Sequence, residues 1–270
     1  MRAVTAQYPD GEHSDDKVFV TDNAVIMLDG ASAFVPVPVP ASVYADRLGR
    51  HVQRALCASQ TEDLRVVLRD GIECTARDLR LSPGQSPSST VTIVREMADR
   101  IDVLVLGDNI VVLPDEVIAD DRIDQAAPAL RERYRGRLAA GYGYDTEHRA
   151  LLVELQTQQA LRRNRPGGYW IAEADPQAAE HAVAASRSVA TTPWAVLATD
   201  GAYNTMQHLR LTDLDRLVTA TETDLASILD RCQSWEATTD PSARQLQRAK
   251  RHDDKTLAVL TFGTHLCHPG

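Results

Sequence analysis

Aspartates at the ends of short apolar runs are the residues of this chain best suited to chemistry. Asp29, Asp108 and Asp200 each close such a run, and Asp253 stands just before another at 256–262. An aspartate at a strand end usually only caps a turn, so each one alone says little. If the strands share a sheet, however, the carboxylates can converge, and two bare charges about 4 Å apart repel by roughly 4 kcal/mol at an effective dielectric near 20. Such a cluster needs cations.

The kind of cation follows from the ligand atoms. Oxygen-only ligands favour hard ions such as magnesium or manganese, whereas softer metals prefer sulfur and imidazole. The cysteines lack the paired spacing of a zinc site. His265, Cys267 and His268 lie in a tail that ends in Pro-Gly, and we expect this tail to be frayed. The sequence therefore predicts a site for hard cations.

The composition is that of an ordinary globular protein. The chain has 270 residues, 43% hydrophobic and 25% charged, and we expect one domain over 1–270. Its net charge of -9 argues against a general nucleic-acid or anionic-membrane surface. No apolar segment approaches the roughly 18 residues of a membrane span, and no signal core follows Met1. With few, unpatterned cysteines, we expect a cytoplasmic protein, and we expect a monomer.

The elements that must position the aspartates alternate between strands and helices. Apolar runs predict strands over 4–7, 17–21, 24–28, 90–94, 101–106, 110–113, 194–199 and 256–262. The turn Asp22-Asn23 tolerates positive φ, so the second and third of these strands should form a hairpin. Apolar stripes and capping residues predict helices over 44–56, 64–79, 128–140, 147–163, 175–186, from 212 or 213 to 231, and 241–250.

The segment Val35–Pro40 alternates valine with proline. Proline locks its own φ and favours extended backbone in the residue before it, so this segment should be extended. We interpret it as a stiff connector. A ligand for a proline-recognition module is the alternative.

The order of the acidic motifs resembles that of the metal-dependent protein serine/threonine phosphatases of the protein phosphatase 2C type, in a bacterial-like single-domain form. The matching motifs, which span Asp16 to Phe262, are Ser14-Asp15-Asp16-Lys17, Asp29-Gly30, Ser88-Ser89-Thr90, Gly107-Asp108-Asn109, Thr199-Asp200-Gly201 and Asp253-Asp254-Lys255-Thr256. The resemblance implies an α+β fold: a four-layer α-β-β-α sandwich of two mostly antiparallel sheets flanked by helical hairpins. It also implies a variable flap-containing region within about 114–190.

The resemblance implies a catalytic site of two divalent cations, Mn²⁺ or Mg²⁺, in the cleft between the sheets. Asp29 and Asp200 would hold the ions, with Asp253 on one and the carbonyl of Gly30 on the other. Asp16 would hold metal-bound water. A water shared by the two ions would attack the phosphorus of phosphoserine or phosphothreonine directly.

Two motif positions bear on a third ion and on the leaving group. Asp108 and Asn204 fall where some relatives bind a weaker third ion, and Asn204 supplies a neutral ligand in place of the usual acid. The family's Asp-Gly-His-Gly-Gly is replaced by residues 29–33, Asp-Gly-Ala-Ser-Ala. The histidine that protonates the leaving group in some relatives is therefore absent, and water or another side chain would have to act.

The phosphate-gripping arginine that relatives carry just upstream of the acidic pair is also absent. Arg2 is the only arginine before Asp16, and His13 could substitute, although a solvated loop histidine is the simpler interpretation. Arg162, Arg163 and Arg165 lie in the implied flap region and could supply the grip or dock substrate. A solvated charge run is the alternative interpretation of these three.

The predicted substrate is a phosphoprotein or phosphopeptide. Two alternatives stay open: a phosphatase-like regulatory or binding module whose turnover was weakened with the loss of the arginine, and a phosphatase for a small molecule. An enzyme should bind manganese and lose activity on Asp200→Ala, whereas the module would bind a partner without turnover. A panel of substrates would reveal the small-molecule phosphatase.

Overall fold

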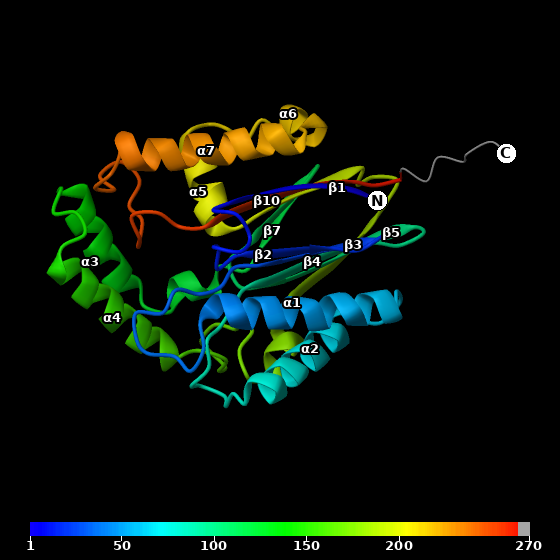
Figure 1. Ribbon diagram of the computed structural model, residues 1–270, viewed down its shortest axis with the longest axis horizontal. Helices are drawn as coiled ribbons and strands as arrows, with labels where there is room; N and C mark the ends of the chain where they lie inside the picture. The colour runs from blue at the N-terminus through cyan, green and yellow to red at the C-terminus, as the bar shows by residue number, and fades with distance from the viewer. Residues whose placement is uncertain (264–270) are drawn as a thin grey trace.

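The computed structural model describes residues 1–263 and arranges them in four layers, helices outside and two sheets inside (Figure 1). Each sheet has five strands, and every pairing is antiparallel. The first sheet has the order β1 (Arg2–Tyr8), β10 (Lys255–Thr261), β9 (Trp194–Ala198), β6 (Ile110–Leu113), β7 (Glu116–Ala119). The second has the order β2 (Lys17–Val20), β3 (Ala24–Leu28), β4 (Val91–Glu96), β5 (Arg100–Leu106), β8 (Val183–Ser188). The predicted fold class is confirmed.

The layers follow from side-chain alternation, which β3 shows most clearly. Its Val25 and Met27 belong to the core between the sheets, together with Leu197 of β9. Ile26 and Leu28 point the other way, into the core beneath the helices α1 (Ala41–Ala58) and α2 (Leu64–Leu79). Successive strand residues face opposite sides of a sheet, and both sides are covered here, so the whole strand is buried. Asp29 therefore leaves β3 from a dry interior.

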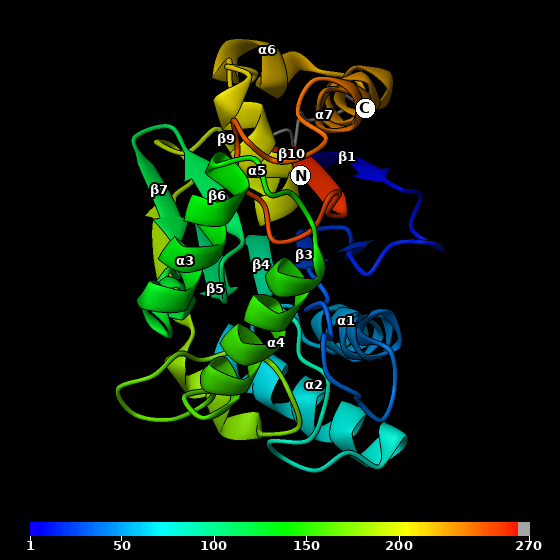
Figure 2. The same ribbon diagram turned by 90° about the vertical axis from the view of Figure 1, so that its left-hand side faces the viewer.

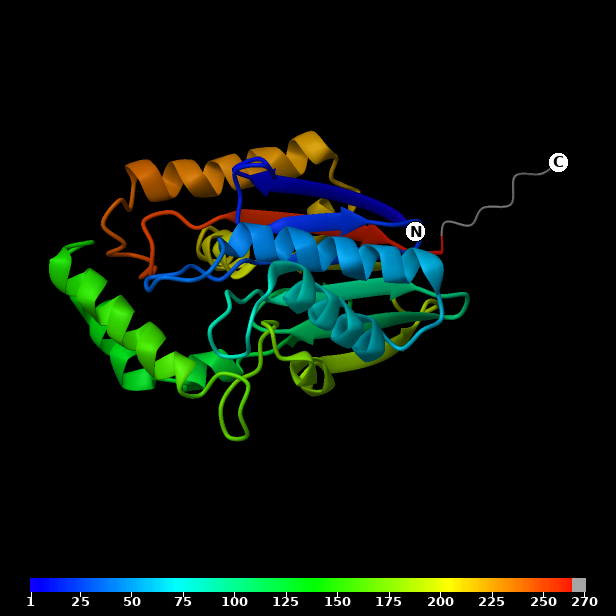
Figure 3. The ribbon, with the colours of Figure 1, turned by 60° about the horizontal axis from the view of Figure 1, so that its bottom comes forward.

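The remaining helices fall into two groups. α5 (Asp200–His208), α6 (Leu214–Thr219) and α7 (Glu222–Thr238) cover the sheet that contains β9 and β10 (Figure 1). α3 (Pro128–Ala139) and α4 (Thr146–Ala160) lie together beyond one end of the sandwich, as Figures 2 and 3 show. They pack against each other and against Phe34 and Ala243. Across residues 1–263, every helix is too short or too polar to cross a bilayer.

Three helix predictions in the second half of the chain were wrong, and two of them concern residues 175–231. Residues 175–186 form a 3-10 helix, η2 (Pro176–His181), followed by the edge strand β8. Side chains of β8 alternate between half-buried and exposed, a pattern of period two that suits a strand paired on one side with β5. The helix expected from 213 to 231 is two helices, because Thr221 and Asp224 form a capping box that starts α7 afresh.

The predicted helix over 241–250 is a loop instead. The Asp240 carboxylate accepts hydrogen bonds from the backbone N–H groups of Arg244 (2.7 Å), Gln245 (3.1 Å) and Leu246 (3.0 Å). It also forms an ion pair with Arg248 at 3.0 Å. A side chain that satisfies three successive N–H groups removes the need for helical carbonyls as partners. This loop brings the chain to Lys250 and Asp253.

Candidate active site

Four aspartates from four segments line one cavity of about 290 Å³. Asp29 directly follows β3, and Asp108 follows β5 with Gly107 between them. Asp200 is the first residue of α5, just after β9, and Asp253 lies just before β10. Because β9 and β10 pair antiparallel, the end of one strand lies beside the start of the other, which brings Asp200 and Asp253 together. The predicted convergence of these carboxylates is present in the structure.

Burial and mutual repulsion raise the pKa values of Asp29, Asp108 and Asp200. Burial raises the pKa of Asp29 well above its usual value, and the charges of Asp16, Asp200, Asp253 and Asp108 raise it further. Burial and the charge of Asp200 raise the pKa of Asp108 to about 7. Burial and Asp253 raise the pKa of Asp200 to about 6, although the N-terminus of α5 favours a negative charge there. Positive charge would relieve this repulsion.

One carboxylate oxygen of Asp16 accepts two hydrogen bonds, and the other accepts none from residues 1–263. Its Oδ2 accepts hydrogen bonds from Oγ1 of Thr199 (3.0 Å) and Oγ1 of Thr256 (2.8 Å). Its Oδ1 is buried and has no hydrogen-bond partner within the described part of the chain. Burial raises the pKa of this carboxyl to about 7 despite the two hydroxyl donors. A buried oxygen without a partner is costly, so this atom is suited to accept a hydrogen bond from a ligand or water.

Two glycines allow the segments to approach one another closely. A Cβ on Gly201 would lie 2.2 Å from the backbone oxygen of Asp254 and 2.9 Å from Cβ of Asp253. A Cβ on Gly30 would lie 2.8 Å from the backbone oxygen of Asp15. Neither approach leaves room for a side chain, so packing requires glycine at both positions.

A second cavity of about 490 Å³ shares Asp108, Asp200 and Asp253 with the first. Asn204 of α5 lines it as well. Asp108 and Asn204, the two residues predicted for a third ion, thus border one cavity beside the main site.

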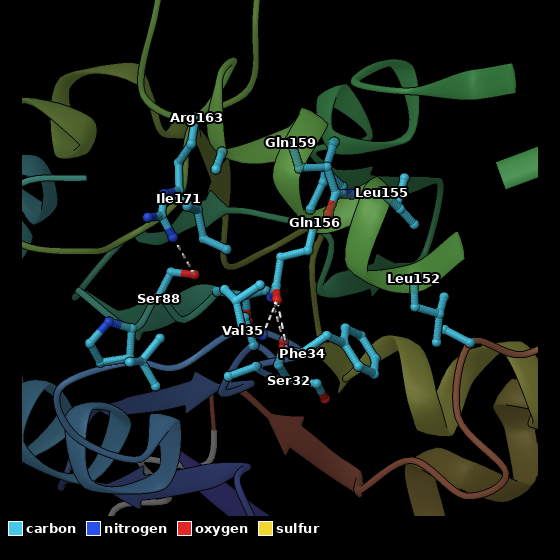
Figure 4. Close-up of a pocket in the computed structure, with 18 of the residues that line it drawn as sticks. Ser32, Phe34, Val35, Ser88, Leu152, Leu155, Gln156, Gln159, Arg163 and Ile171 are labelled. Carbon is cyan, nitrogen blue, oxygen red and sulfur yellow. Dashed lines mark hydrogen bonds between the residues drawn. The ribbon is translucent and has the colours of Figure 1, made fainter. Parts of the chain in front are cut away.

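Of the five predicted substrate contacts, Arg163 alone lines the main cavity. Its guanidinium donates weakly to Oγ of Ser88 at 3.5 Å (Figure 4). It also donates to the carbonyl of Gly84 at 3.3 Å. Arg163 has no carboxylate within 4.0 Å among residues 1–263. Its charge is therefore available to a ligand.

The structure places the other four predicted contacts elsewhere. Arg2 pairs with Thr261, at the end of β10 far from Asp253. His13 has a side chain that is 75% exposed and contacts Asp10 at 2.7 Å. Arg162 and Arg165 are exposed beside Arg163 and do not border the cavity.

Lys250 is a site residue that sequence reasoning missed. Its ammonium forms an ion pair with Asp253 inside the cavity. Burial lowers the pKa of this lysine, but the charge and hydrogen bond of Asp253 and the charge of Asp29 outweigh burial, so the pKa is raised. The only sequence signal was its position three residues before Asp253, and the predicted helix over 241–250 concealed it.

The residues present fit hard cations. Within residues 1–263, no three His, Cys, Asp or Glu side chains already stand as a closed metal site. The cavity nevertheless presents four carboxylates and neither thiol nor imidazole. Asp16 does not line this cavity, but its charge raises the pKa of Asp29, and one of its oxygens is buried without a hydrogen-bond partner among residues 1–263. Magnesium and manganese prefer oxygen donors of this kind.

Comparisons with known proteins identify the fold. No family model and no curated protein matches this sequence. Among solved structures, PppA from Pseudomonas aeruginosa is 15% identical with a TM-score of 0.56, covering 97% of each chain. A bacterial serine phosphatase is 11% identical with a TM-score of 0.55 over 97% of each chain. MsPP, a PPM Ser-Thr phosphatase from Mycobacterium smegmatis, is 14% identical with a TM-score of 0.54, covering 97% of this chain and 99% of that one. The chain thus has the fold of the PPM serine/threonine phosphatases.

Proposed function

We propose that this protein is a metal-dependent phosphatase that hydrolyses phosphoserine and phosphothreonine in phosphoproteins or phosphopeptides. The observation that carries the proposal is the convergence of Asp29, Asp108, Asp200 and Asp253 on one cavity. These carboxylates come from distant parts of the sequence, and their mutual repulsion has no benefit for folding. A fold shared with serine/threonine phosphatases supports the same conclusion.

The residues of the proposed active site have separate tasks. Asp29, Asp200 and Asp253, with the carbonyl of Gly30, would hold two Mn²⁺ or Mg²⁺ ions. Such ions supply Lewis acidity and an activated nucleophile when bound. Asp16 would accept a proton or hydrogen bond from water at its free Oδ1. Asp108 and Asn204 border the second cavity and would serve a weaker third ion.

Arg163 is proposed to contact the phosphate or the peptide that carries it. It lines the same cavity as the four aspartates, and its hydrogen-bond partners among the described residues are the hydroxyl of Ser88 and the carbonyl of Gly84 rather than a carboxylate. A guanidinium presents several N–H donors in a plane, which suits phosphate oxygens. It would take the place of the arginine that is absent upstream of Asp16.

A chelator-controlled assay tests this function. Wild-type protein in manganese should hydrolyse p-nitrophenyl phosphate and phosphopeptides, and EDTA should abolish both activities. Asp29→Asn should lower kcat/KM by at least about a hundredfold, because removing a strong electrostatic contact typically costs that much. A wild-type protein that stays inactive on every substrate in manganese would refute the proposal.

A second candidate function is a phosphatase-like binding or regulatory module with weakened turnover. It is favoured by the ammonium of Lys250 on Asp253 and by the solvated position of His13, which leaves Asp16 without a cationic neighbour upstream. Such a module would bind manganese by calorimetry yet show no manganese-dependent hydrolysis. If Lys250→Met gained manganese-dependent hydrolysis, this lysine would be the cause of the weakened turnover.

A further inference from the structure

Gln156 of α4 holds one wall of the main cavity in place. Its Oε1 accepts hydrogen bonds from the backbone N–H groups of Phe34 (2.7 Å) and Val35 (3.0 Å). Its Nε2 donates to the carbonyl of Ser32 at 2.9 Å. Figure 4 shows Gln156 pointing at these three residues, so a single amide fastens segment 32–35 to α4. The segment has no strand or helix of its own to fix it.

The wall that Gln156 holds is apolar and continuous with the carboxylates. Phe34 and Val35 from the fastened segment, and Leu152 and Leu155 from α4, line the same cavity as Asp29. Val35 is 37% exposed, so part of this surface is open to a ligand. Phosphate needs no apolar surface, since polar groups and cations bind it. Leu152 and Leu155 are 3% and 7% exposed and are mostly occupied by packing in the core of α3 and α4. The apolar surface that remains open, mainly that of Val35, is suited to another part of the substrate.

We infer that this wall is a specificity subsite for an apolar side chain next to the phosphorylated residue, and that Gln156 is the positioning residue that forms it. The inference rests on the proposed phosphatase function. The occupant is a side chain of leucine or valine size in an extended phosphopeptide, because the apolar surface adjoins the carboxylates that would hold the cations next to its phosphate. Burying most of such a side chain improves kcat/KM by about tenfold.

Two pairs of phosphoserine peptides test this subsite. The two peptides of a pair differ at one position, which is leucine in one peptide and serine in the other. This position comes immediately before the phosphoserine in the first pair and immediately after it in the second pair. In manganese, wild-type protein should prefer the leucine peptide of at least one pair by about tenfold in kcat/KM. Equal rates on both members of both pairs would overturn the inference. Inactivity on every peptide and on p-nitrophenyl phosphate would instead overturn the proposed function.

Variants of the wall separate positioning from general damage. Gln156→Ala should reduce the leucine preference to about threefold or less, whereas Gln156→Glu, which keeps both acceptor bonds, should retain most of it. Gln159→Ala is the matched control, because Gln159 lines the cavity one turn later on α4 without hydrogen bonds to segment 32–35. Its preference should stay as in wild type.

Val35→Ser removes apolar surface and leaves the backbone bond to Gln156 in place, so it should also weaken the preference. Full preference in both Gln156→Ala and Val35→Ser, or equal loss in Gln159→Ala, would contradict the inference.

Discussion

At the scale of single residues, the site is defined by carboxylates whose charges oppose one another. Burial is the main cause of the raised pKa of Asp29, and the neighbouring aspartates add to it. A protein keeps such a costly arrangement when a ligand compensates for it. Among residues 1–263, Lys250 forms an ion pair with Asp253 and with none of the other three carboxylates of the cavity, which leaves those three to cations from solution.

This arrangement predicts an unusual dependence of stability on pH. Asp16 and Asp108, with a usual pKa of 3.8, have folded-state pKa values of about 7. The folded protein therefore binds more protons than the unfolded chain between those values, so this part of its stability is lost as pH rises from about 4 to about 7. Asp29→Asn removes one charge from the cluster. Without metal, its melting temperature should exceed that of wild type by about 4 °C or more at pH 7.5.

The same comparison contains its own control. Near pH 4.5, Asp16, Asp108 and Asp200 lie below their folded-state pKa values of about 7, 7 and 6 and are largely protonated, so the two melting temperatures should lie much closer together. Saturating manganese at pH 7.5 should reverse the order, because a ligand that binds only the folded state stabilises it. A constant difference at both pH values, with no effect of manganese, would show that the carboxylates neither interact nor bind metal.

At the scale of elements, two contacts fix the helices α5 and α7 against the start of β10. The first is the close approach at Gly201, where a Cβ would lie 2.2 Å from the backbone oxygen of Asp254. Gly201→Ala should destabilise the fold by roughly 1–3 kcal/mol or more, as overpacking does. Urea unfolding would measure this. Gly136→Ala in α3 is the control: nothing lies within 4 Å of that position, so alanine should stabilise by about 0.5–1 kcal/mol.

The second contact is a buried ion pair between α7 and β10. Nζ of Lys255 lies 2.9 Å from Oε2 of Glu236 and donates to the carbonyl of Asp253 at 2.8 Å, while Oε1 of Glu236 accepts from Thr205 of α5 at 2.8 Å. The lysine and glutamate side chains are 0% and 1% exposed. Lys255→Met should cost roughly 3 kcal/mol or more, because it leaves the buried Glu236 carboxylate with only the imidazole of His252 at 3.3 Å and the hydroxyl of Thr205 at 2.8 Å.

A double-mutant cycle checks that pair. Lys255→Met combined with Glu236→Gln should cost less than the sum of the single changes by at least about 1 kcal/mol in urea unfolding. Strictly additive costs would mean that the two side chains act independently.

At the scale of the whole molecule, the sequence predicted the sheets and the convergence of the aspartates better than it predicted the second half of the chain. Strands such as β3 and β9 are buried on both sides, and the apolar runs that result are visible in the sequence. Segment 241–250 was mispredicted because the Asp240 side chain, rather than local propensity, determines its backbone. Lys250 was missed for the same reason. The hydrogen bonds of Gln156 to segment 32–35 join parts of the chain more than 120 residues apart, which no local sequence pattern reveals.

The most direct test of this account is a crystal of the protein grown with excess manganese, with anomalous diffraction recorded at the manganese edge. The account predicts two strong anomalous peaks in the cavity bounded by Asp29, Asp200 and Asp253, and their loss in Asp29→Asn. A well-diffracting crystal with no peak in that cavity, or with peaks only elsewhere on the protein, would contradict it.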